Sequence, residues 1–488
     1  MTTRIGKVAI VAAEIAPDAK TGGLADVIAA LPHAMAKCGA EPCVILPGYH
    51  ALLQRRSVRI VAEGLSAPLG PNHEPFRLLR TDDPGGIPLY LIDHPGFFAR
   101  SGIYGEAGHD YPDNLRRYIF FGRAAAVVAG LIHSDVVHAH DWHAATLPIV
   151  MRADHAMRAR FAHTLAVFTI HNLAFQGIFP AADYPLLGLD WSWFTIDYLE
   201  FHNQVNLMKG AIMFADGAST VSPSYALEVA NDPALGFGLE GVLRGKGDRF
   251  VGILNGADYG EWNPLHDDLI QRHFSPTRRI GKTRCRDALR QRLRLPARSD
   301  APIIAMVTRM TPQKGIGLVA DAIDRIMSLG VHFVMLSGGD PNLEHFFSEA
   351  ETRHPDAFRL IIGFDQALAH QIQAGSDIFL MPSRFEPCGL TQMYALKYGT
   401  VPVVRATGGL RDTIKEFDPA TAIGNGFVFN EYDADAMVAA LERAVRTFHD
   451  DTHWRRLMGN CFHANFSWDR AAREYLEWFA RLRKSMRQ

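Results

Sequence analysis

The sequence has few cysteines, no long apolar segment and almost no net charge. Its 488 residues include five cysteines, none of them in a CxxC pair, so neither a disulfide framework nor a thiolate zinc site is favoured. The longest purely apolar run, 124–132, is far shorter than the ~18 residues of a membrane-spanning helix. The formal charge of −2 provides no attraction for nucleic acid or an anionic membrane.

The first residues also lack the features of a targeting segment. They contain neither the charged and apolar regions of an export signal nor the Arg- and Ser-rich composition of a transit peptide. Together with the sparse cysteines, this predicts a cytoplasmic protein. The 42 glycines and 27 prolines are too few for a low-complexity or disordered chain, and the length predicts two or three domains.

Short apolar or β-branched runs alternate with helical stretches along the chain. Near-continuous apolar strands separated by helices are typical of parallel sheets covered on both faces. Thirteen such strands are too many for one ordinary doubly wound sheet, so the sequence predicts an α/β protein with two Rossmann-like domains. The predicted strands cover residues 7–13, 42–46, 88–92, 136–140, 166–171, 218–221, 250–254, 302–308, 332–337, 359–364, 377–382, 401–405 and 426–429.

The domain boundary is expected where a strand ends at residue 254 and an irregular stretch begins. This predicts a first domain over 1–255, a second over 256–466 and a C-terminal amphipathic helix within 467–488. The stretch 277–294 carries eight Lys or Arg residues and one Asp. In a nearly neutral protein we expect this stretch to be a solvated helix face rather than an anion-binding patch.

The loop after the first strand is a candidate binding site. Residues 20–24 read Lys-Thr-Gly-Gly-Leu, and paired glycines before a helix let the backbone approach an anionic ligand closely. The pattern is neither GxGxxG nor a P-loop, and a tight turn between strand and helix is the alternative. Only ten of the fifty cations are lysine, so Lys20 beside Gly22 and Gly23 favours contact with phosphate or sugar.

A histidine-rich segment ends the strand at 136–140. His138 and His140 lie on the same face of that strand, whereas His143 lies beyond the turn. No HExxH motif or cysteine partner accompanies them, so a metal site is disfavoured. Asp141 follows this strand as His171 follows the next one, and two such strand ends in one sheet point to a crevice.

The second half of the chain holds two further candidates. Arg309 and Lys314 follow a predicted strand and could clamp a diphosphate; the alternative is two surface cations in a loop. Glu386 comes directly before a predicted helix whose free N–H groups can receive a leaving phosphate, while the carboxylate receives sugar hydroxyls.

Taken together, these motifs resemble those of bacterial glycogen synthases and plant starch synthases, in the same order from residue 7 to about residue 480. They are 20–24, 140–143 (His-Asp-Trp-His), 313–315 (Gln-Lys-Gly) after Arg309, and 384–390 (Arg-Phe-Glu-Pro-Cys-Gly-Leu). The resemblance implies transfer of glucose from ADP-glucose to the non-reducing 4-hydroxyl of an α-1,4-glucan such as glycogen, with retention and without a metal or other cofactor. It also implies the GT-B architecture, in which two domains face a deep cleft and the C-terminal helix packs back on the first domain.

The resemblance further assigns roles to individual residues. It implies catalytic roles for Lys20, Asp141, His171, Arg309, Lys314 and Glu386. It implies substrate contacts for Lys20, Gly22, Gly23, Asp26, Asn255, Phe364, Cys388, Gly389, Leu390 and Thr391, with Tyr104 and Asn114 on the acceptor side. Phe364 stands where relatives usually have Tyr. It can still stack on the nucleotide base, but it lacks the tyrosine hydroxyl.

Charge development during transfer suggests the mechanism. Breaking the glucosyl–phosphate bond places negative charge on the leaving diphosphate, which fixed cations stabilise. No second carboxylate pairs with Glu386 in the sequence, so we favour front-face displacement over a covalent glycosyl-enzyme. The alternatives are a glucan phosphorylase, a UDP-glucose-preferring synthase and a catalytically silent glucan-binding scaffold; the oligomeric state is not predicted.

Overall fold

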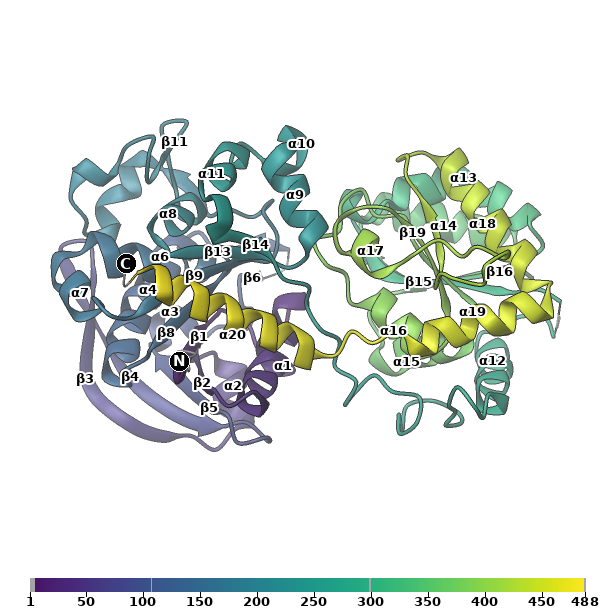
Figure 1. The fold of residues 1–488 in the computed structure, drawn as a ribbon, viewed down its shortest axis with the longest axis horizontal. Coiled ribbons are helices and arrows are strands. Elements are labelled where there is room, and N and C mark those ends of the chain that lie inside the picture. Colours follow the sequence, from purple (N-terminus) through teal and green to yellow (C-terminus); the bar gives the residue numbers. More distant parts are fainter. Residues whose placement is uncertain (1–4, 107, 298–299, 487–488) are drawn as a thin grey trace. The chain divides into compact units, whose positions relative to one another are not determined.

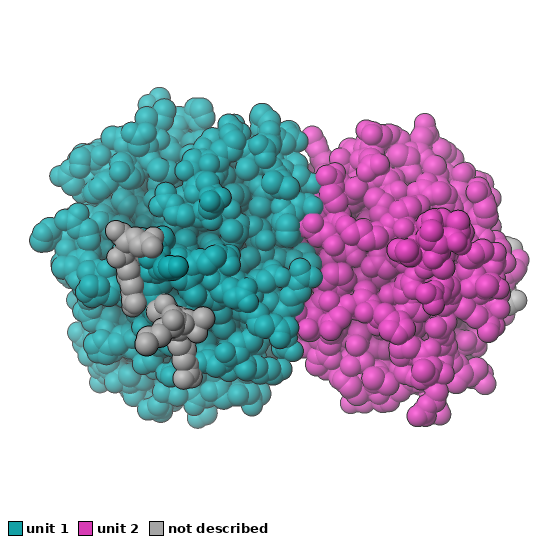
Figure 2. All heavy atoms as spheres, in the orientation of Figure 1, with its two compact units in different colours: residues 1–256, 468–488 teal, residues 257–467 magenta. Residues whose placement is uncertain are grey.

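The computed structural model describes residues 5–106, 108–297 and 300–486, and the chain divides into two compact units. Unit 1 comprises residues 1–256 and 468–488, and unit 2 comprises residues 257–467 (Figure 2). Each unit has a sheet and a hydrophobic core of its own. Among the described residues, no helix combines the length and the apolar character needed to cross a membrane.

Unit 1 is built on a nine-stranded sheet in the order β14-β13-β9-β8-β1-β2-β5-β4-β3 (Figure 1). Its strands are β1 (Lys7–Val11), β2 (Glu41–Pro47), β3 (Arg59–Leu69), β4 (Asn72–Asp82), β5 (Pro88–Asp93), β8 (Val136–His140), β9 (Leu165–Ile170), β13 (Gly217–Thr220) and β14 (Phe250–Gly252). The strands from β14 to β5 pair in parallel. The short strands are β6 (Gly105–Glu106), β7 (His109–Asp110), β10 (Ile178–Pro180), β11 (Glu200–Phe201) and β12 (Gln204–Asn206).

One edge of this sheet differs from the fully parallel sheet that the sequence predicts. Strands β3 and β4 were not predicted; β3 pairs antiparallel with β4, and β4 pairs antiparallel with β5. Both expose many of their residues to solvent, so they lack the near-continuous apolar runs that marked the parallel strands. Antiparallel strands can face water on one side, which explains why the apolar pattern missed them.

The helices of unit 1 connect and cover these strands. They are α1 (Gly23–Lys37), α2 (His50–Arg55), α3 (Pro95–Phe98), α4 (Asn114–Leu131), α5 (Asp141–Ala144), α6 (Thr146–Ala153), α7 (His155–Arg160), α8 (Leu207–Phe214), α9 (Pro223–Asn231), α10 (Pro233–Gly236), α11 (Glu240–Gly245) and α20 (Trp468–Ser485). Three 3₁₀ turns lie at Ala181–Leu187, Trp191–Trp193 and Gly247–Arg249.

Unit 2 contains a six-stranded, fully parallel sheet in the order β17-β16-β15-β18-β19-β20. Its strands are β15 (Ile303–Met310), β16 (His332–Gly339), β17 (Phe358–Ile362), β18 (Ile378–Met381), β19 (Val401–Arg405) and β20 (Phe427–Phe429). Its helices are α12 (Ile280–Arg292), α13 (Ile316–Ser328), α14 (Pro341–Arg353), α15 (Gln366–Gly375), α16 (Thr391–Lys397), α17 (Gly408–Thr413), α18 (Ala434–Phe448) and α19 (Asp451–His463), with a 3₁₀ turn at Pro312–Lys314.

Most cations of the basic stretch 277–294 are exposed or partly exposed, as expected for a solvated helix face, but two are buried. The stretch forms α12, in which the side chains of Lys282 and Arg290 are buried. The Lys282 ammonium donates to the backbone oxygen of Ala374 and to Thr400 Oγ1, at 3.1 and 2.8 Å. Burial lowers the pKa of Lys282 to about 8. The Arg290 guanidinium donates from Nη2 to the backbone oxygen of Ala301 at 2.7 Å, whereas its Nε has no hydrogen-bond partner among the described residues.

The last helix, α20, belongs to the core of unit 1. It packs against α1 and β9 and buries Trp468, Tyr475, Trp478, Phe479 and Leu482, among others. The approach to the sheet is close, because a Cβ atom at Gly217 of β13 would lie 2.7 Å from Cζ2 of Trp478.

Truncating Trp478 to Ala tests how much the core of unit 1 depends on α20. Because Trp478 is fully buried, we expect Trp478→Ala to destabilise unit 1 by about 3–5 kcal/mol. Arg473→Ala, on the exposed face of the same helix, should change stability by less than about 0.5 kcal/mol. Urea unfolding followed by tryptophan fluorescence and circular dichroism measures both; equal effects would contradict this packing.

Candidate functional site

The loop after β1 is held by a carboxylate that the sequence analysis did not single out. Glu14 is buried and accepts hydrogen bonds from the backbone N–H groups of Thr21 and Gly22, at 2.8 and 3.0 Å. Its other oxygen accepts from the hydroxyls of Thr21 and Tyr104, both at 2.7 Å. Four donors around one carboxylate fix the loop that carries Lys20.

Lys20 and Asp26 form an ion pair at the start of α1. The Lys20 Nζ atom lies 2.6 Å from Asp26 Oδ1, and both side chains remain partly exposed. A Cβ atom at Gly22 or Gly23 would meet no atom within 4 Å. Packing within unit 1 therefore does not require these glycines, in agreement with a loop kept open for close approach by a ligand.

The histidines predicted to share a strand face do so. The rings of His138 and His140 lie 4.0 Å apart between centroids, and His140 Nδ1 lies 2.9 Å from Nε2 of His171, which follows β9. Burial lowers the pKa values of His138 and His171 to about 3, and burial with two neighbouring imidazoles holds the pKa of His140 well below its usual value. All three rings are therefore neutral near pH 7.

Asp141 joins the two strand ends. Its backbone has φ of +56°, a conformation that Asp tolerates better than most residues, and its Oδ1 accepts a 2.7 Å hydrogen bond from the N–H of His171. Burial raises its pKa to about 7, and this effect outweighs the backbone N–H groups of His171 and Asn172, which lower it. Asp141 thus positions the backbone of His171.

Tyr104 and Asn114 occupy adjacent positions in unit 1. The Tyr104 ring stacks on His143 with centroids 4.4 Å apart. Burial raises the pKa of Tyr104 well above the usual range, and the nearby charge of Glu14 adds to this effect. Asn114 is buried, donates to the Tyr104 backbone oxygen at 2.8 Å and accepts from Arg117 at 2.6 Å. The described side-chain contacts of Asn114 therefore support the Tyr104 segment.

Asn255 lies at the end of unit 1. Its side chain is buried, and its Oδ1 has no hydrogen-bond partner among the described residues. An unsatisfied buried acceptor is rare in a native fold. This atom is consequently able to accept a hydrogen bond from a bound group.

In unit 2 the structure brings Lys314 and Glu386 together. Lys314 Nζ lies 2.6 Å from Glu386 Oε2, and Ser383 Oγ donates to the same oxygen at 3.0 Å. The backbone N–H of Arg384 donates to the oxygen of Gln313 at 2.8 Å, which joins the two loops. Gly315 has φ of +71°, and a Cβ atom there would lie 2.0 Å from the backbone oxygen of Pro382. Only glycine permits this close approach.

The segment after Glu386 is fixed from its other side. The N–H of Gly409 donates to the Glu386 backbone oxygen at 3.0 Å, and a Cβ atom at Gly408 would lie 2.0 Å from that oxygen. The sequence analysis missed Ser383, Gly408 and Gly409, although a glycine pair directly after a buried strand was a usable signal.

The remaining predicted residues of unit 2 lie at strand and helix ends. Arg309, at the end of β15, is exposed, and its side chain makes no hydrogen bond with the described residues. Phe364 is 80% exposed beyond β17. Cys388 is buried, Gly389 has φ of +72°, Leu390 precedes α16 and Thr391 begins it.

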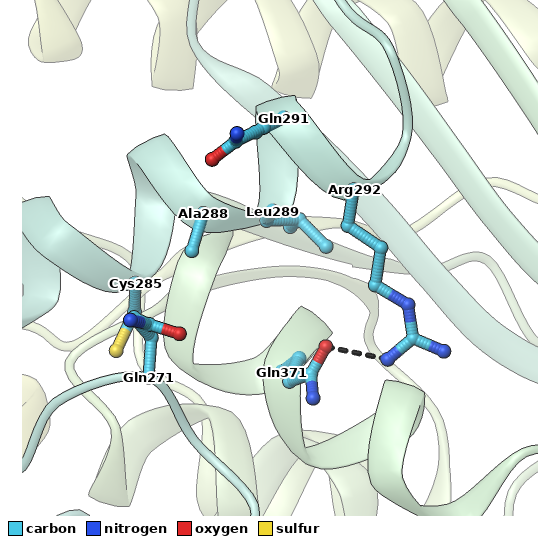
Figure 3. A pocket seen from close by; sticks show the side chains of 7 residues that line it. All are labelled: Gln271, Cys285, Ala288, Leu289, Gln291, Arg292 and Gln371. Atoms are coloured by element: carbon cyan, nitrogen blue, oxygen red, sulfur yellow. Dashed lines mark hydrogen bonds between the residues drawn. The ribbon is translucent and has the colours of Figure 1, made fainter.

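A cavity of about 240 Å³ lies elsewhere in unit 2, between α12 and α15 (Figure 3). It is lined by Gln271, Cys285, Ala288, Leu289, Gln291, Arg292 and Gln371. Arg292 donates to Gln371 Oε1 at 2.6 Å and pairs with Asp365. None of the lining residues is a predicted site residue.

No group of three or more His, Cys, Asp or Glu side chains in the described ranges could hold a metal ion.

Comparison with known proteins identifies the class first. A sucrose-phosphate synthase from Thermosynechococcus elongatus superimposes with a TM-score of 0.59 over 98% of this chain and 99% of that one, at 16% identity. The family model for glycosyl transferases group 1 matches residues 287–455, and the model for the starch synthase catalytic domain matches residues 7–245. The two units therefore form a GT-B glycosyltransferase, as the sequence predicted.

Closer relatives define the family. A glycogen synthase from Anaeromyxobacter sp. (strain Fw109-5) is 43% identical over 472 residues, 96% of this chain and 98% of the relative. Glycogen synthase 2 from Geobacter sulfurreducens is 43% identical over 473 residues, 96% and 97% of the two chains. The catalytic domain of starch synthase IV from Arabidopsis thaliana, solved with ADP and acarbose, has a TM-score of 0.90 and 35% identity, covering 99% of this chain and 100% of that one. The chain belongs to the glycogen and starch synthase family of glycosyltransferases.

The raised pKa of Asp141 predicts a pH-dependent contribution to stability. In the unfolded chain this carboxyl ionises near its ordinary pKa of 3.8, whereas in the folded protein it keeps its proton up to about pH 7. Between these values the folded state holds the extra proton, so raising the pH favours unfolding. Asp141→Asn removes this contribution and keeps the acceptor for the His171 N–H.

We therefore expect the stability of Asp141→Asn relative to wild type to rise from about pH 4 to pH 7 and then to level off. The buried histidines have the opposite pH dependence, but they are present in both proteins and cancel in the difference. Urea midpoints measured at intervals between pH 4 and pH 8 give the profile. A difference that does not change with pH would show that Asp141 is ionised throughout.

Proposed function

We propose that this chain transfers glucose from ADP-glucose to the non-reducing 4-hydroxyl of an α-1,4-glucan, with retention of configuration. The observation that carries the proposal is the arrangement of Lys314, Glu386 and Ser383 at the ends of two parallel strands, with Arg309 at the end of one of them. The ADP in the solved starch synthase IV supports the choice of nucleotide. We further propose that unit 1 binds the acceptor and contributes contacts to the donor, that unit 2 binds the nucleotide sugar, and that the enzyme works in the cytoplasm.

The cations of unit 2 would act on the leaving group. Glu386 and two joined loops position the Lys314 ammonium in advance, so little reorganisation is needed when a diphosphate binds. Arg309 lies near the end of β15, the strand that precedes Lys314, with no competing hydrogen bond among the described residues. Preorganised positive charge lowers the barrier most where negative charge develops, which in this reaction is the diphosphate.

Retention is best explained by displacement on one face of the sugar. The described hydrogen-bond partners of the Glu386 carboxylate are Lys314 and Ser383, neither of which is a second carboxylate. In the proposed step the bond between the anomeric carbon and the phosphate oxygen breaks while the bond to the acceptor oxygen forms on the same face. The acceptor hydroxyl gives its proton to the leaving phosphate, and Glu386 orients the sugar. No metal or other cofactor takes part in this proposal.

Residues of unit 1 complete the proposed machinery. Lys20 and Asp26 would contact the donor at the open loop, with Gly22 and Gly23 allowing close approach. His171 would lie beside the transferred sugar, held by Asp141 through its backbone. Asn255 supplies an unsatisfied acceptor, and Tyr104 presents its ring on the acceptor side.

The donor preference can be measured directly. Initial rates with glycogen primer and either ADP-glucose or UDP-glucose, in the presence of EDTA, should favour ADP-glucose. A preference for UDP-glucose would overturn the choice of nucleotide. Phe364 would then be the first residue to test, because it lacks the hydroxyl of the tyrosine that relatives usually have there. Glycogen binding without turnover of either donor would indicate the silent scaffold instead.

Replacing Glu386 tests the centre of the proposed site. Glu386→Gln keeps the size of the side chain but removes the charge that holds Lys314, and we expect kcat to fall by about 10²- to 10³-fold. Glu416→Gln is the matched control, because Glu416 is also a glutamate of unit 2 that pairs with a cation, Arg443. Its kcat should stay within about twofold of wild type. Equal losses in the two variants would argue against a catalytic role for Glu386.

A further inference from the structure

The contact between the His140 and His171 rings constrains which of their nitrogens carry protons. In the parallel pairing of β8 with β9, His140 lies opposite Thr169, two residues before His171. Nδ1 of His140 lies 2.9 Å from Nε2 of His171. Because both rings are neutral, one of these two nitrogens must carry a proton and the other must accept it.

The surroundings of His140 decide which nitrogen donates. Its other nitrogen, Nε2, is buried and has no hydrogen-bond partner among the described residues. A proton on that nitrogen would be a buried donor without an acceptor, which native structures tolerate less readily than an under-used acceptor. The proton therefore belongs on Nδ1 of His140, which donates to Nε2 of His171.

This assignment determines the state of His171. With Nε2 accepting, the neutral His171 ring carries its own proton on Nδ1. Nδ1 of the half-buried His171 side chain has no hydrogen-bond partner among the described residues. Its N–H is therefore available to a bound molecule. The Asp141 side chain accepts a hydrogen bond from the backbone N–H of His171 and so helps to hold this residue in place.

We propose that His140 is a positioning residue that fixes the tautomer of His171, so that His171 presents an Nδ1–H donor to an oxygen of the reacting sugar. The identity of that oxygen rests on the proposed function, whereas the tautomer does not. If the proton moved to Nε2, His171 would present a lone pair to the substrate oxygen and repel it. A wrong histidine tautomer leaves the geometry intact but lowers the rate.

The tautomer itself can be read without substrate. ¹⁵N chemical shifts and couplings of histidine-labelled protein distinguish protonated from bare ring nitrogens, and loss of a signal in His171→Gln assigns the ring. We expect His171 to be protonated on Nδ1 in wild type and in His140→Asn, whose amide N–H can replace the Nδ1–H donor. In His140→Leu no donor holds Nε2 as an acceptor, so we expect both tautomers of His171 to be populated. A wild-type His171 protonated on Nε2 would overturn the proposal.

Kinetics separates positioning from packing. We expect His140→Leu to lower kcat by about tenfold with the KM for the donor sugar within about threefold of wild type, because the His171 ring is no longer held in one tautomer. His140→Asn should recover most of that loss. The matched control is His138→Leu, which removes a buried imidazole from the same face of the strand. The His138 ring forms its hydrogen bond with Thr169 rather than with His171. The kcat of this variant should remain within about threefold of wild type.

The outcomes separate the positioning role of His140 from a packing effect and from the proposed function. Equal losses of kcat in His140→Leu and His140→Asn, or in His138→Leu, would show a packing effect and contradict the positioning role. Thermal unfolding of each variant identifies any that fail to fold, and His140→Gln then serves as a second replacement that lacks a donor at the Nδ1 position. If wild type transfers no glucose, the proposed function fails, while the ¹⁵N measurement still decides the tautomer.

Discussion

The parallel pairing of β8 with β1 and β9 is the constraint on which the site in unit 1 depends. In this register Val11 lies opposite Ala139 and His140 lies opposite Thr169. The residues that follow all three strands consequently leave the sheet at the same edge. A shift of one residue along β8 would turn its histidines to the other face of the sheet. The hydrogen bonds among His140, Asp141 and His171 exist only in the observed register.

Unit 2 uses the same constraint with different chemistry. Strands β15 and β18 are parallel neighbours, with Ile304 opposite Ile378, so the loops after them emerge together and bring Lys314 to Glu386. Glycines at 315 and 408 allow backbone contacts that any side chain would block. A cation and a carboxylate held this tightly are positioned before a substrate arrives, which is the condition for electrostatic stabilisation of a developing charge.

Much of this arrangement could be predicted from the sequence, because it follows from local patterns. Buried parallel strands appear as apolar runs, and 136–140 and 401–405 match β8 and β19 residue for residue. The exposed strands β3 and β4 have no such run. Glu14 was missed because a single carboxylate after an apolar strand has no diagnostic spacing, and its partner Tyr104 lies 90 residues away. The burial of Lys282 inside a basic stretch likewise depends on tertiary contacts that charge patterning does not contain.

The central proposal is that this chain extends α-1,4-glucans from ADP-glucose with retention. The most direct test is to incubate the protein with glycogen and ADP-[¹⁴C]glucose and to digest the labelled polymer with β-amylase, which releases maltose from non-reducing α-1,4-linked ends. Radioactivity recovered as maltose is the result that this account predicts. Label that stays in the polymer after digestion, or that never enters it, would contradict the linkage, the stereochemistry or the activity itself.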